Sequence, residues 1–139
     1  MPVSQSLNWV SLLSIFIALL ALVVSLAKHR ADEFRTRDAQ AKKAWSDFLT
    51  LAFENPDLTT TSIACVNSKR YEQYEYFVYM LLMRADDILQ CFPRSNYWSG
   101  QIKHQLQYHG QYLADWSDDD IDHFTPQLAK MIREVSSNA

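Results

Sequence analysis

The stretch LNWVSLLSIFIALLALVVSLA, Leu7 to Ala27, decides the fold of this 139-residue chain. It contains no charged residue and consists mainly of Leu, Ile, Val, Phe and Ala. At a rise of about 1.5 Å per residue, a helix of this length is roughly 31 Å long, close to the ~30 Å thickness of the hydrocarbon core of a bilayer. Because a single segment in lipid can satisfy its backbone hydrogen bonds only as a helix, the stretch predicts one transmembrane helix.

Small side chains recur along this helix at spacings of three and four residues, which places them on one face. Small residues let helices approach closely in lipid, so the stripe predicts packing against a second span, most simply that of another copy. The near-3.5-residue repeat predicts a left-handed crossing. Chance is the alternative, because Ser and Ala are common in such helices. The stripe comprises Ser11, Ser14, Ala18, Ala21 and Ser25.

A cleaved signal peptide is the alternative interpretation, since Ser25-Leu26-Ala27 has the small-x-small form that signal peptidase prefers. Against it, no Lys or Arg precedes the run, and the run exceeds the ~7 to 15 residues of a signal-peptide core. Basic residues follow the run at once, and Lys and Arg beside a span stay on the cytoplasmic side. We therefore expect residues 1–27 to form a short external N-terminus and a transmembrane helix. The basic residues are Lys28, Arg30, Arg35, Arg37, Lys42 and Lys43.

Residues 28–44, KHRADEFRTRDAQAKKA, predict a basic juxtamembrane stalk that continues the membrane helix. They contain strong helix formers, no Gly or Pro, and acid-before-base pairs at Glu33/Arg37 and Asp38/Lys42. A four-and-three spacing also predicts a heptad seam through which stalks pack together. The alternative is a solvated single helix whose last three seam residues belong to the core of the following domain. The seam comprises Ala27, Ala31, Phe34, Asp38, Ala41, Trp45, Phe48 and Ala52.

Residues 45–139 predict a small cytosolic helical bundle, so the expected fold is all-α and oligomeric. The first helix should end at Asn55-Pro56, because the residue before proline resists helical geometry. The next, residues 69–92, has one apolar stripe and further apolar residues opposite it. A helix that is apolar nearly all round is usually buried all round, so we expect it to be shared with a neighbouring subunit or to form the domain centre. The opposite residues are Tyr76, Tyr79, Met80 and Met83.

A further helix is expected over residues 97–116, with one narrow arc facing the core. His109 lies on that arc and is interpreted as a core histidine rather than a catalyst. The arc comprises Trp98, Ile102, Leu106, His109, Leu113 and Trp116.

Two signals for the start of a helix follow along the chain. Ser117 and Asp120 have the spacing of a capping box and predict a short helix to Phe124. Thr125 as N-cap and Pro126 at the first helical position predict a last amphipathic helix.

Composition excludes several function classes. Thirteen Lys and Arg against 16 Asp and Glu disfavour a duplex nucleic-acid surface, and only two Gly disfavour phosphate-cradling loops. Cys65 and Cys91 suit free thiols in a reducing cytoplasm, although they could pair in an oxidising compartment. The acids of residues 118–122 lack a calcium-loop glycine, and His104 and His109 are five apart, the wrong spacing for a zinc pair. We expect no metal, no cofactor and no enzymatic activity.

Two segments without acidic residues predict a site for an anionic ligand. Residues 88–114 interleave basic and aromatic side chains, which neutralise phosphates and stack bases. Residues 58–71 place basic side chains at the start of a helix, where the dipole favours anions. The alternative is that the aromatic residues are mostly core and the charge depletion is chance. We expect the two segments to converge on one ligand, most easily between subunits. The expected ligand-binding residues are Asn67, Lys69, Arg70, Arg94, Tyr97, His104 and Tyr108.

The order of these features resembles a known class of protein. A charge-free span and a basic stalk precede WSDFLTLAFENPDL (Trp45 to Leu58) and YEYFVYMLLMRADDIL (Tyr74 to Leu89), as in small single-pass bacterial membrane proteins with helical cytosolic domains. The layout is similar to a membrane effector associated with type III CRISPR systems, which binds cyclic oligoadenylate and acts on the membrane as an oligomer. The resemblance implies a bacterial inner-membrane location, a homo-oligomer such as a tetramer, and a role in antiviral defence.

Two functions are compatible with these features. In the first, a nucleotide second messenger binds the cytosolic helices of a membrane-anchored oligomer and thereby alters membrane integrity. In the second, the chain is a membrane-anchored module that recruits a protein partner through its helical face, without a small-molecule ligand. The expected partners are the lipid bilayer, further copies of the chain and an anionic nucleotide, but no duplex nucleic acid.

Overall fold

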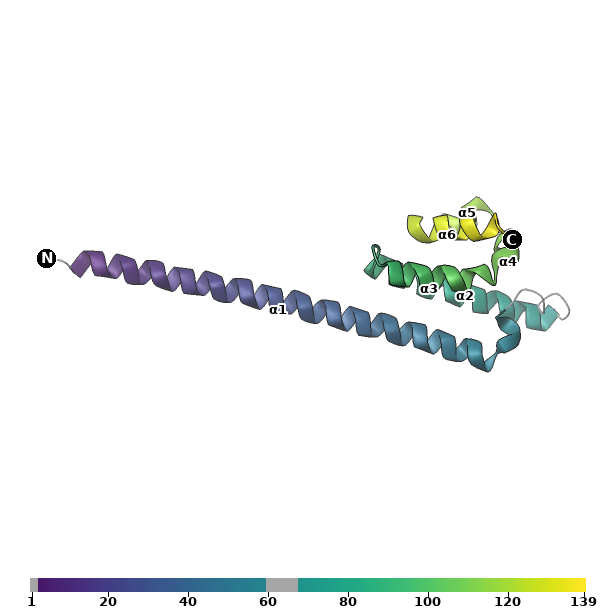
Figure 1. The fold of residues 1–139 in the computed structure, drawn as a ribbon, viewed down its shortest axis with the longest axis horizontal. Coiled ribbons are helices and arrows are strands. Elements are labelled where there is room, and N and C mark those ends of the chain that lie inside the picture. Colours follow the sequence, from purple (N-terminus) through teal and green to yellow (C-terminus); the bar gives the residue numbers. More distant parts are fainter. Residues whose placement is uncertain (1–2, 60–67) are drawn as a thin grey trace. The chain divides into compact units, whose positions relative to one another are not determined.

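The computed structural model describes residues 3–59 and 68–139, with side chains from residue 8 onward in the first range and from residue 70 onward in the second. The chain divides into two compact units, Met1–Gln40 and Ala41–Ala139. Helix α1 (Val3–Glu54) begins in the first unit and ends in the second (Figure 1). Every regular element within the described residues is a helix, which confirms the all-α fold.

The described part of the first unit belongs to α1, and its side chains from Asn8 onward are exposed, except that of Asp38, which is partly buried. From Asn8 onward α1 is long and apolar enough to cross a membrane, by length and composition. Its most apolar 18-residue window has a mean hydropathy of 2.8, and none of that window is buried. Residues as large as Trp9 and Phe16 are 75% and 61% exposed. The charge-free run is therefore helical, as the sequence predicts.

The second unit is arranged around α2 (Ser68–Cys91). The end of α1 and the short 3₁₀ helix η1 (Pro56–Leu58) precede α2. Four helices follow, and α6 packs against α2, α3 and α4, while α2 also contacts α3 and η1 (Figure 1). They are α3 (Asn96–Gln107), α4 (Gly110–Leu113), α5 (Asp118–Ile121) and α6 (Pro126–Ser136).

One face of α2 forms the centre of the core. Its buried side chains recur at the predicted three-and-four spacing, and each fully buried large apolar side chain contributes roughly 1.5–3 kcal/mol to folding. This face therefore holds the surrounding helices together. Its fully buried members are Tyr74, Val78, Leu81, Leu82 and Ala85, all 0% exposed.

The end of α1 belongs to the same core. Ala41, Trp45 and Phe48 are all buried. The Trp45 ring meets the Trp98 ring edge-on at a centroid distance of 6.2 Å, and Phe48 lies 5.2 Å from Phe77. Of the two alternatives for the last seam residues, the structure shows the one in which they join the domain core. Packing of stalks against one another stays a prediction.

The predicted start signals are confirmed. The Ser117 hydroxyl accepts a hydrogen bond from the Asp120 backbone N–H at 3.3 Å, and the Asp120 carboxylate accepts one from the Ser117 N–H at 3.1 Å. These two bonds form the capping box of α5, which ends at Ile121 rather than at Phe124. At α6, Thr125 is the N-cap and the helix begins at a proline.

The prediction of one helix over residues 97–116 is wrong, because the chain breaks between Gln107 and Gly110. Gly110 lies against the end of α6: a Cβ at this position would stand 2.9 Å from the Val135 carbonyl oxygen and 3.1 Å from the Ala139 Cβ. The end of α6 therefore packs directly against the Gly110 backbone, which has no side chain. The helix breaks beside this glycine, a residue with low helix propensity.

His109 sits at this break and is a core histidine, as predicted. It is 1% exposed, and its Nδ1 is hydrogen-bonded to the Tyr74 Oη at 2.9 Å. Burial lowers the pKa of His109 to about 4, because desolvation penalises the charged imidazolium. His109 is therefore neutral in the folded protein at physiological pH.

We predict opposite effects of alanine at the two glycines. Gly110→Ala should destabilise the domain by about 1–3 kcal/mol, because the new methyl group collides with α6 backbone. Gly100→Ala, within α3 and with nothing within 4 Å, should stabilise it by about 0.5–1 kcal/mol. Thermal unfolding of the full-length variants in maltoside micelles, followed by near-ultraviolet circular dichroism, measures both. Equal shifts would contradict the packing at Gly110.

We also predict a pH dependence of stability that originates at His109. The pKa of this residue rises from about 4 in the folded state to the ordinary value of about 6.5 on unfolding. The unfolded chain therefore binds more protons, and stability present above pH ~6.5 is lost as the pH falls towards 4, by up to about 3 kcal/mol. Chemical denaturation between pH 4 and 7 should show this loss in wild type and in His123→Gln, an exposed control, but not in His109→Gln. Parallel curves for all three proteins would refute the assignment.

Candidate functional site

Of the basic residues predicted at the start of α2, Arg70 is paired with a carboxylate. Asn67 and the side chain of Lys69 lie outside the described residues. The Arg70 guanidinium forms an ion pair and a hydrogen bond with the Asp57 carboxylate of η1, and its Nη1 donates to the Gln73 amide oxygen at 2.6 Å. The sequence segment lacks acids, but the fold places one against Arg70. This half of the predicted site has lost most of its attraction for an anion.

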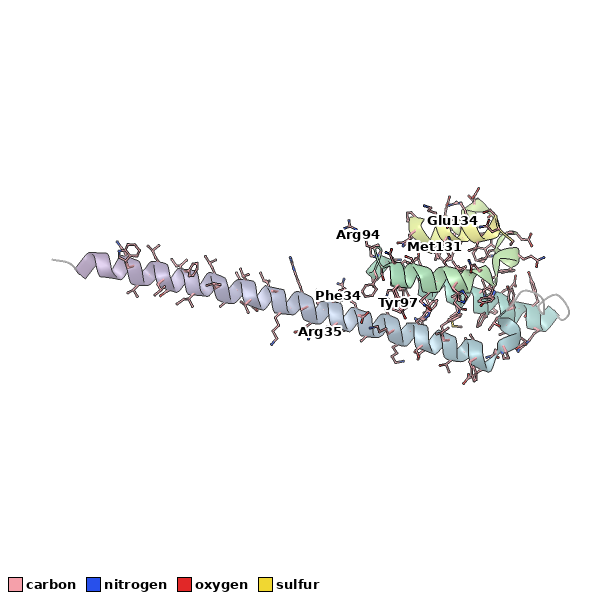
Figure 2. All side chains as sticks on the ribbon, viewed as in Figure 1. Phe34, Arg35, Arg94, Tyr97, Met131 and Glu134 are labelled. Atoms are coloured by element: carbon pink, nitrogen blue, oxygen red, sulfur yellow. The ribbon has the colours of Figure 1, made fainter. Side chains whose placement is uncertain are left out.

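The second acid-free segment also receives an acidic partner. Lys103 of α3 donates to the Glu134 carboxylate of α6 at 2.6 Å, and this hydrogen bond lowers the pKa of Glu134. Arg94 is different: in the part of the chain that the structure describes, it has no acidic partner. Figure 2 shows Arg94 and Tyr97 at the turn where α2 gives way to α3.

The predicted aromatic residues lie on one exposed surface of α3. Tyr97 and Tyr108 are 62% and 47% exposed. The Tyr108 hydroxyl and the His104 Nε2 are hydrogen-bonded at 3.2 Å. Helix α3 itself contains no Asp or Glu. We call this surface, made of Arg94, Tyr97, Gln101, His104 and Tyr108, the α3 face.

Within one chain the two acid-free segments touch at Tyr71 and Tyr112, whose rings lie edge-on at a centroid distance of 6.4 Å, but their arginines lie far apart. Arg70 lies in the first turn of α2 and Arg94 just after its end, and the 24 residues of α2 make it about 36 Å long. The structure places Tyr97, His104 and Tyr108 along α3 with Arg94 just before it, and separates Arg70 from Arg94 by the length of α2. Contact of one ligand with both Arg70 and Arg94 would therefore require two chains.

The small residues predicted to pack in the membrane all lie on α1, and their positions are exposed. The Ser14 hydroxyl donates to the Val10 carbonyl oxygen at 2.9 Å, so this proton is bound within the helix. Self-association through the stripe stays a prediction. Its members are Ser11, Ser14, Ala18, Ala21 and Ser25.

The exposed side of α2 forms a second surface, a groove. Tyr76, Tyr79, Met80 and Met83 are 73%, 52%, 39% and 43% exposed within one chain. Of the two positions expected for α2, a contact shared with a neighbouring subunit is the one that would cover these residues, and it stays a prediction. We call the groove that these residues line the α2 groove.

The α2 groove consists of three adjoining hollows. The first, about 250 Å³, lies between α2 and the α1–η1 turn and includes Tyr76 and Met80. The second, about 490 Å³, is lined by Tyr76, Tyr79 and Trp116 together with two glutamates. The third, about 550 Å³, shares Tyr79 and Trp116 with the second and continues to Asp86. The second and third hollows therefore adjoin along α2, whereas the first meets the second only at Tyr76.

Carboxylates surround the second and third hollows. Glu72 and Glu75 line the second hollow, and Asp86 and Asp120 line the third. Hydrogen bonding from the Ser117 hydroxyl lowers the pKa of Asp120, which keeps that group ionised. An anionic ligand is therefore disfavoured in the α2 groove, and a cation is favoured.

Aromatic contacts fix the wall of the groove that faces α2. Tyr112 lies edge-on to Tyr74 at a ring-centroid distance of 5.2 Å, and edge-on to Trp116 at 6.0 Å. Trp116 in turn stacks on Phe124 at 6.3 Å. Burial raises the pKa of Tyr112, so its hydroxyl stays protonated and reaches Glu75 at 3.4 Å. These rings support one another, so the wall is already formed before any ligand binds.

Two further observations bear on chemistry. Among the described residues, no group of three or more His, Cys, Asp or Glu side chains is placed to hold a metal ion. Cys91 is an exposed free thiol, whereas Cys65 lies outside the described residues.

The fold and its surfaces define the class as an all-helical domain that follows a long apolar helix and carries two exposed aromatic surfaces of different charge. No family model, curated protein or solved structure matches the chain.

Proposed function

We propose that this protein is a membrane-anchored oligomeric effector whose helical domain binds an anionic nucleotide second messenger on the α3 face. The observation that carries the proposal is Arg94, an exposed cation without an acidic partner among the described residues, three residues before Tyr97 on the acid-free helix α3. A guanidinium binds phosphate oxygens through paired N–H groups, and tyrosine rings stack on bases. The α3 face offers both kinds of contact.

Membrane anchoring by α1 follows from its exposed apolar surface. Side chains such as Trp9 and Phe16 would be costly to leave in water over so long a helix, whereas lipid solvates them. The basic residues that follow support a cytoplasmic position of the helical domain, at the inner face of a bacterial inner membrane. A messenger made in the cytoplasm would reach it there.

An oligomer of this chain would suit the proposed effector function. The exposed Tyr and Met side chains of α2 form an apolar surface of the kind that marks contact sites between proteins. A closed ring of copies would repeat the α3 face around its axis, which suits a symmetric cyclic ligand. The similarity of layout to the CRISPR-associated effector makes cyclic oligoadenylate the messenger to test. Binding would rearrange the oligomer and so alter membrane integrity in antiviral defence.

We predict that Arg94→Ala weakens binding of cyclic oligoadenylates by about 1.5–3 kcal/mol, because a charge-assisted hydrogen bond to phosphate is lost. Tyr108→Ala should cost about 1–3 kcal/mol through lost base stacking. The matched control is Arg84→Ala, since Arg84 is also exposed and belongs to α2. Calorimetric titration of the full-length variants in maltoside micelles measures the affinities. Equal affinity of wild type, Arg94→Ala and Tyr108→Ala would rule out the α3 face.

The second candidate function is a membrane-anchored module that recruits a protein partner, and the α2 groove favours it. From Glu72 to Asp86 the second and third hollows follow α2 for about 20 Å, long enough for three to four turns of a bound helix. Its carboxylates, among them Glu72 and Glu75, favour a basic partner.

Photo-crosslinking distinguishes the two functions. In this experiment benzoylphenylalanine replaces Tyr76. If the α2 groove binds a foreign protein, this variant should form a crosslink to a basic helical segment of that protein. The control is the same substitution at Tyr97, which is exposed on α3. An adduct with a second copy of this chain would instead support the oligomeric effector and contradict the recruitment module.

A further inference from the structure

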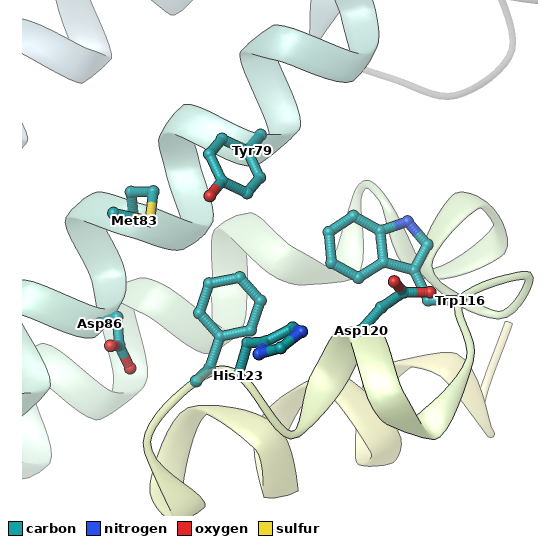
Figure 3. Close-up of a pocket in the computed structure, with 7 residues that line it drawn as sticks. Tyr79, Met83, Asp86, Trp116, Asp120 and His123 are labelled. Carbon is teal, nitrogen blue, oxygen red and sulfur yellow. The ribbon is translucent and has the colours of Figure 1, made fainter.

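The third hollow of the α2 groove is a small-molecule-sized site with aromatic walls. Tyr79 and Met83 line it from α2, while Trp116 and Phe124 line it from the chain around α5. Its volume of about 550 Å³ falls in the usual range of ligand pockets, about 300–1,000 Å³. Figure 3 shows Tyr79 and Met83 of α2 on one side of the hollow and Trp116, Asp120 and His123 on the other.

Two carboxylates determine the charge of the hollow. Asp86 Oδ1 accepts the Thr125 backbone N–H at 2.8 Å, and its Oδ2 accepts the Gln90 side-chain N–H at 2.9 Å. Asp120 is held by Ser117 in the capping box. Neutral donors thus hold both carboxylates in place, and His123 also lines the hollow beside Asp120.

Aromatic rings and carboxylates together select one kind of ligand. The face of an aromatic ring attracts a cation, most strongly for Trp, and this is how quaternary ammonium groups are recognised in aromatic cages. A bare metal ion is a poorer match, because the described residues place no three ligating side chains together. An anion is repelled by Asp86 and Asp120.

We propose that this hollow binds an organic cation, an alkylated ammonium or a guanidinium, between the Tyr79 and Trp116 rings with Asp86 and Asp120 as counterions. The cation belongs either to a free small molecule or to the Lys or Arg side chain of a bound protein. The site differs in charge and location from the α3 face, so it goes beyond nucleotide binding and does not depend on it.

Indole resonances of Trp116 report on the site directly. The probes are choline and ethylguanidinium, added to full-length ¹⁵N-tryptophan-labelled protein in maltoside micelles, which carry no ammonium group. The chain has four tryptophans, and Trp116→Phe assigns the relevant signal. Both probes should shift the Trp116 signal saturably, and the neutral choline analogue 3,3-dimethyl-1-butanol should not.

Variants separate the site from a non-specific effect. Tyr79→Leu should weaken choline binding by about 2- to 30-fold, the range expected for loss of one cation–π contact. Asp86→Asn should weaken it as well, while the matched control Asp87→Asn, exposed and not part of the lining, should leave it unchanged. Because Asp86→Asn also alters a backbone contact, Tyr79→Leu tests the proposal if the first variant fails to fold.

A second pair of probes tests whether the cation is a free small molecule or a side chain of a bound protein. Tighter binding of acetyl-arginine-methylamide or acetyl-lysine-methylamide than of choline assigns the site to a side chain of a protein. Tighter binding of choline assigns it to a free amine. Either result supports a cation site. An equal shift of Trp116 by 3,3-dimethyl-1-butanol, or no shift with any cation, would overturn it.

Discussion

The structure of the domain depends on the burial of one face of α2. This helix is apolar on almost every side, yet its neighbours can cover only part of its circumference. The end of α1, η1, α3 and α6 all pack against the covered part, and the aromatic contacts of Trp45 and Phe48 join α1 to it. What they leave uncovered is the α2 groove. Stability and the candidate interaction surface therefore arise from the same helix.

Charge is distributed unevenly over this scaffold. The domain unit has nine Lys and Arg residues against thirteen Asp and Glu, so most of its cations find an acidic partner. Arg70, Lys103 and Arg133 each pair with carboxylates from another element. The pairing leaves Arg94 as an exposed cation beside the α3 face, while surplus acids such as Asp86 line the α2 groove. The two surfaces consequently suit ligands of opposite charge.

This separation would let the proposed nucleotide binding and the proposed association be distinct properties of one small domain. A phosphate-bearing ligand is attracted to Arg94 and repelled by the carboxylates of the α2 groove. A basic partner, a second copy or an organic cation has the opposite preference. Neither surface needs to rearrange for the other to be occupied, because each belongs to a different face of the helical core. If binding at the α3 face changes binding at the α2 groove, the effect would have to pass through the packing of α2 against α3.

The sequence by itself determined the features that depend on near neighbours in the chain. The apolar run of α1, the end before Asn55-Pro56, the capping box at Ser117 and the core position of His109 all follow from composition and helical spacing. Each is set by residues within a few positions, so a local pattern suffices to predict it.

Only the tertiary structure decided the features that depend on distant residues. The break before Gly110 arises because α6 packs against its backbone, which no pattern within residues 97–116 records. The partners of Arg70 and Lys103 lie 13 and 31 residues away, so segments without acids in the sequence are not free of acids in space. The α2 groove likewise depends on distant residues. The sequence of α2 is apolar on two sides, and the packing of the other helices covers only one of them.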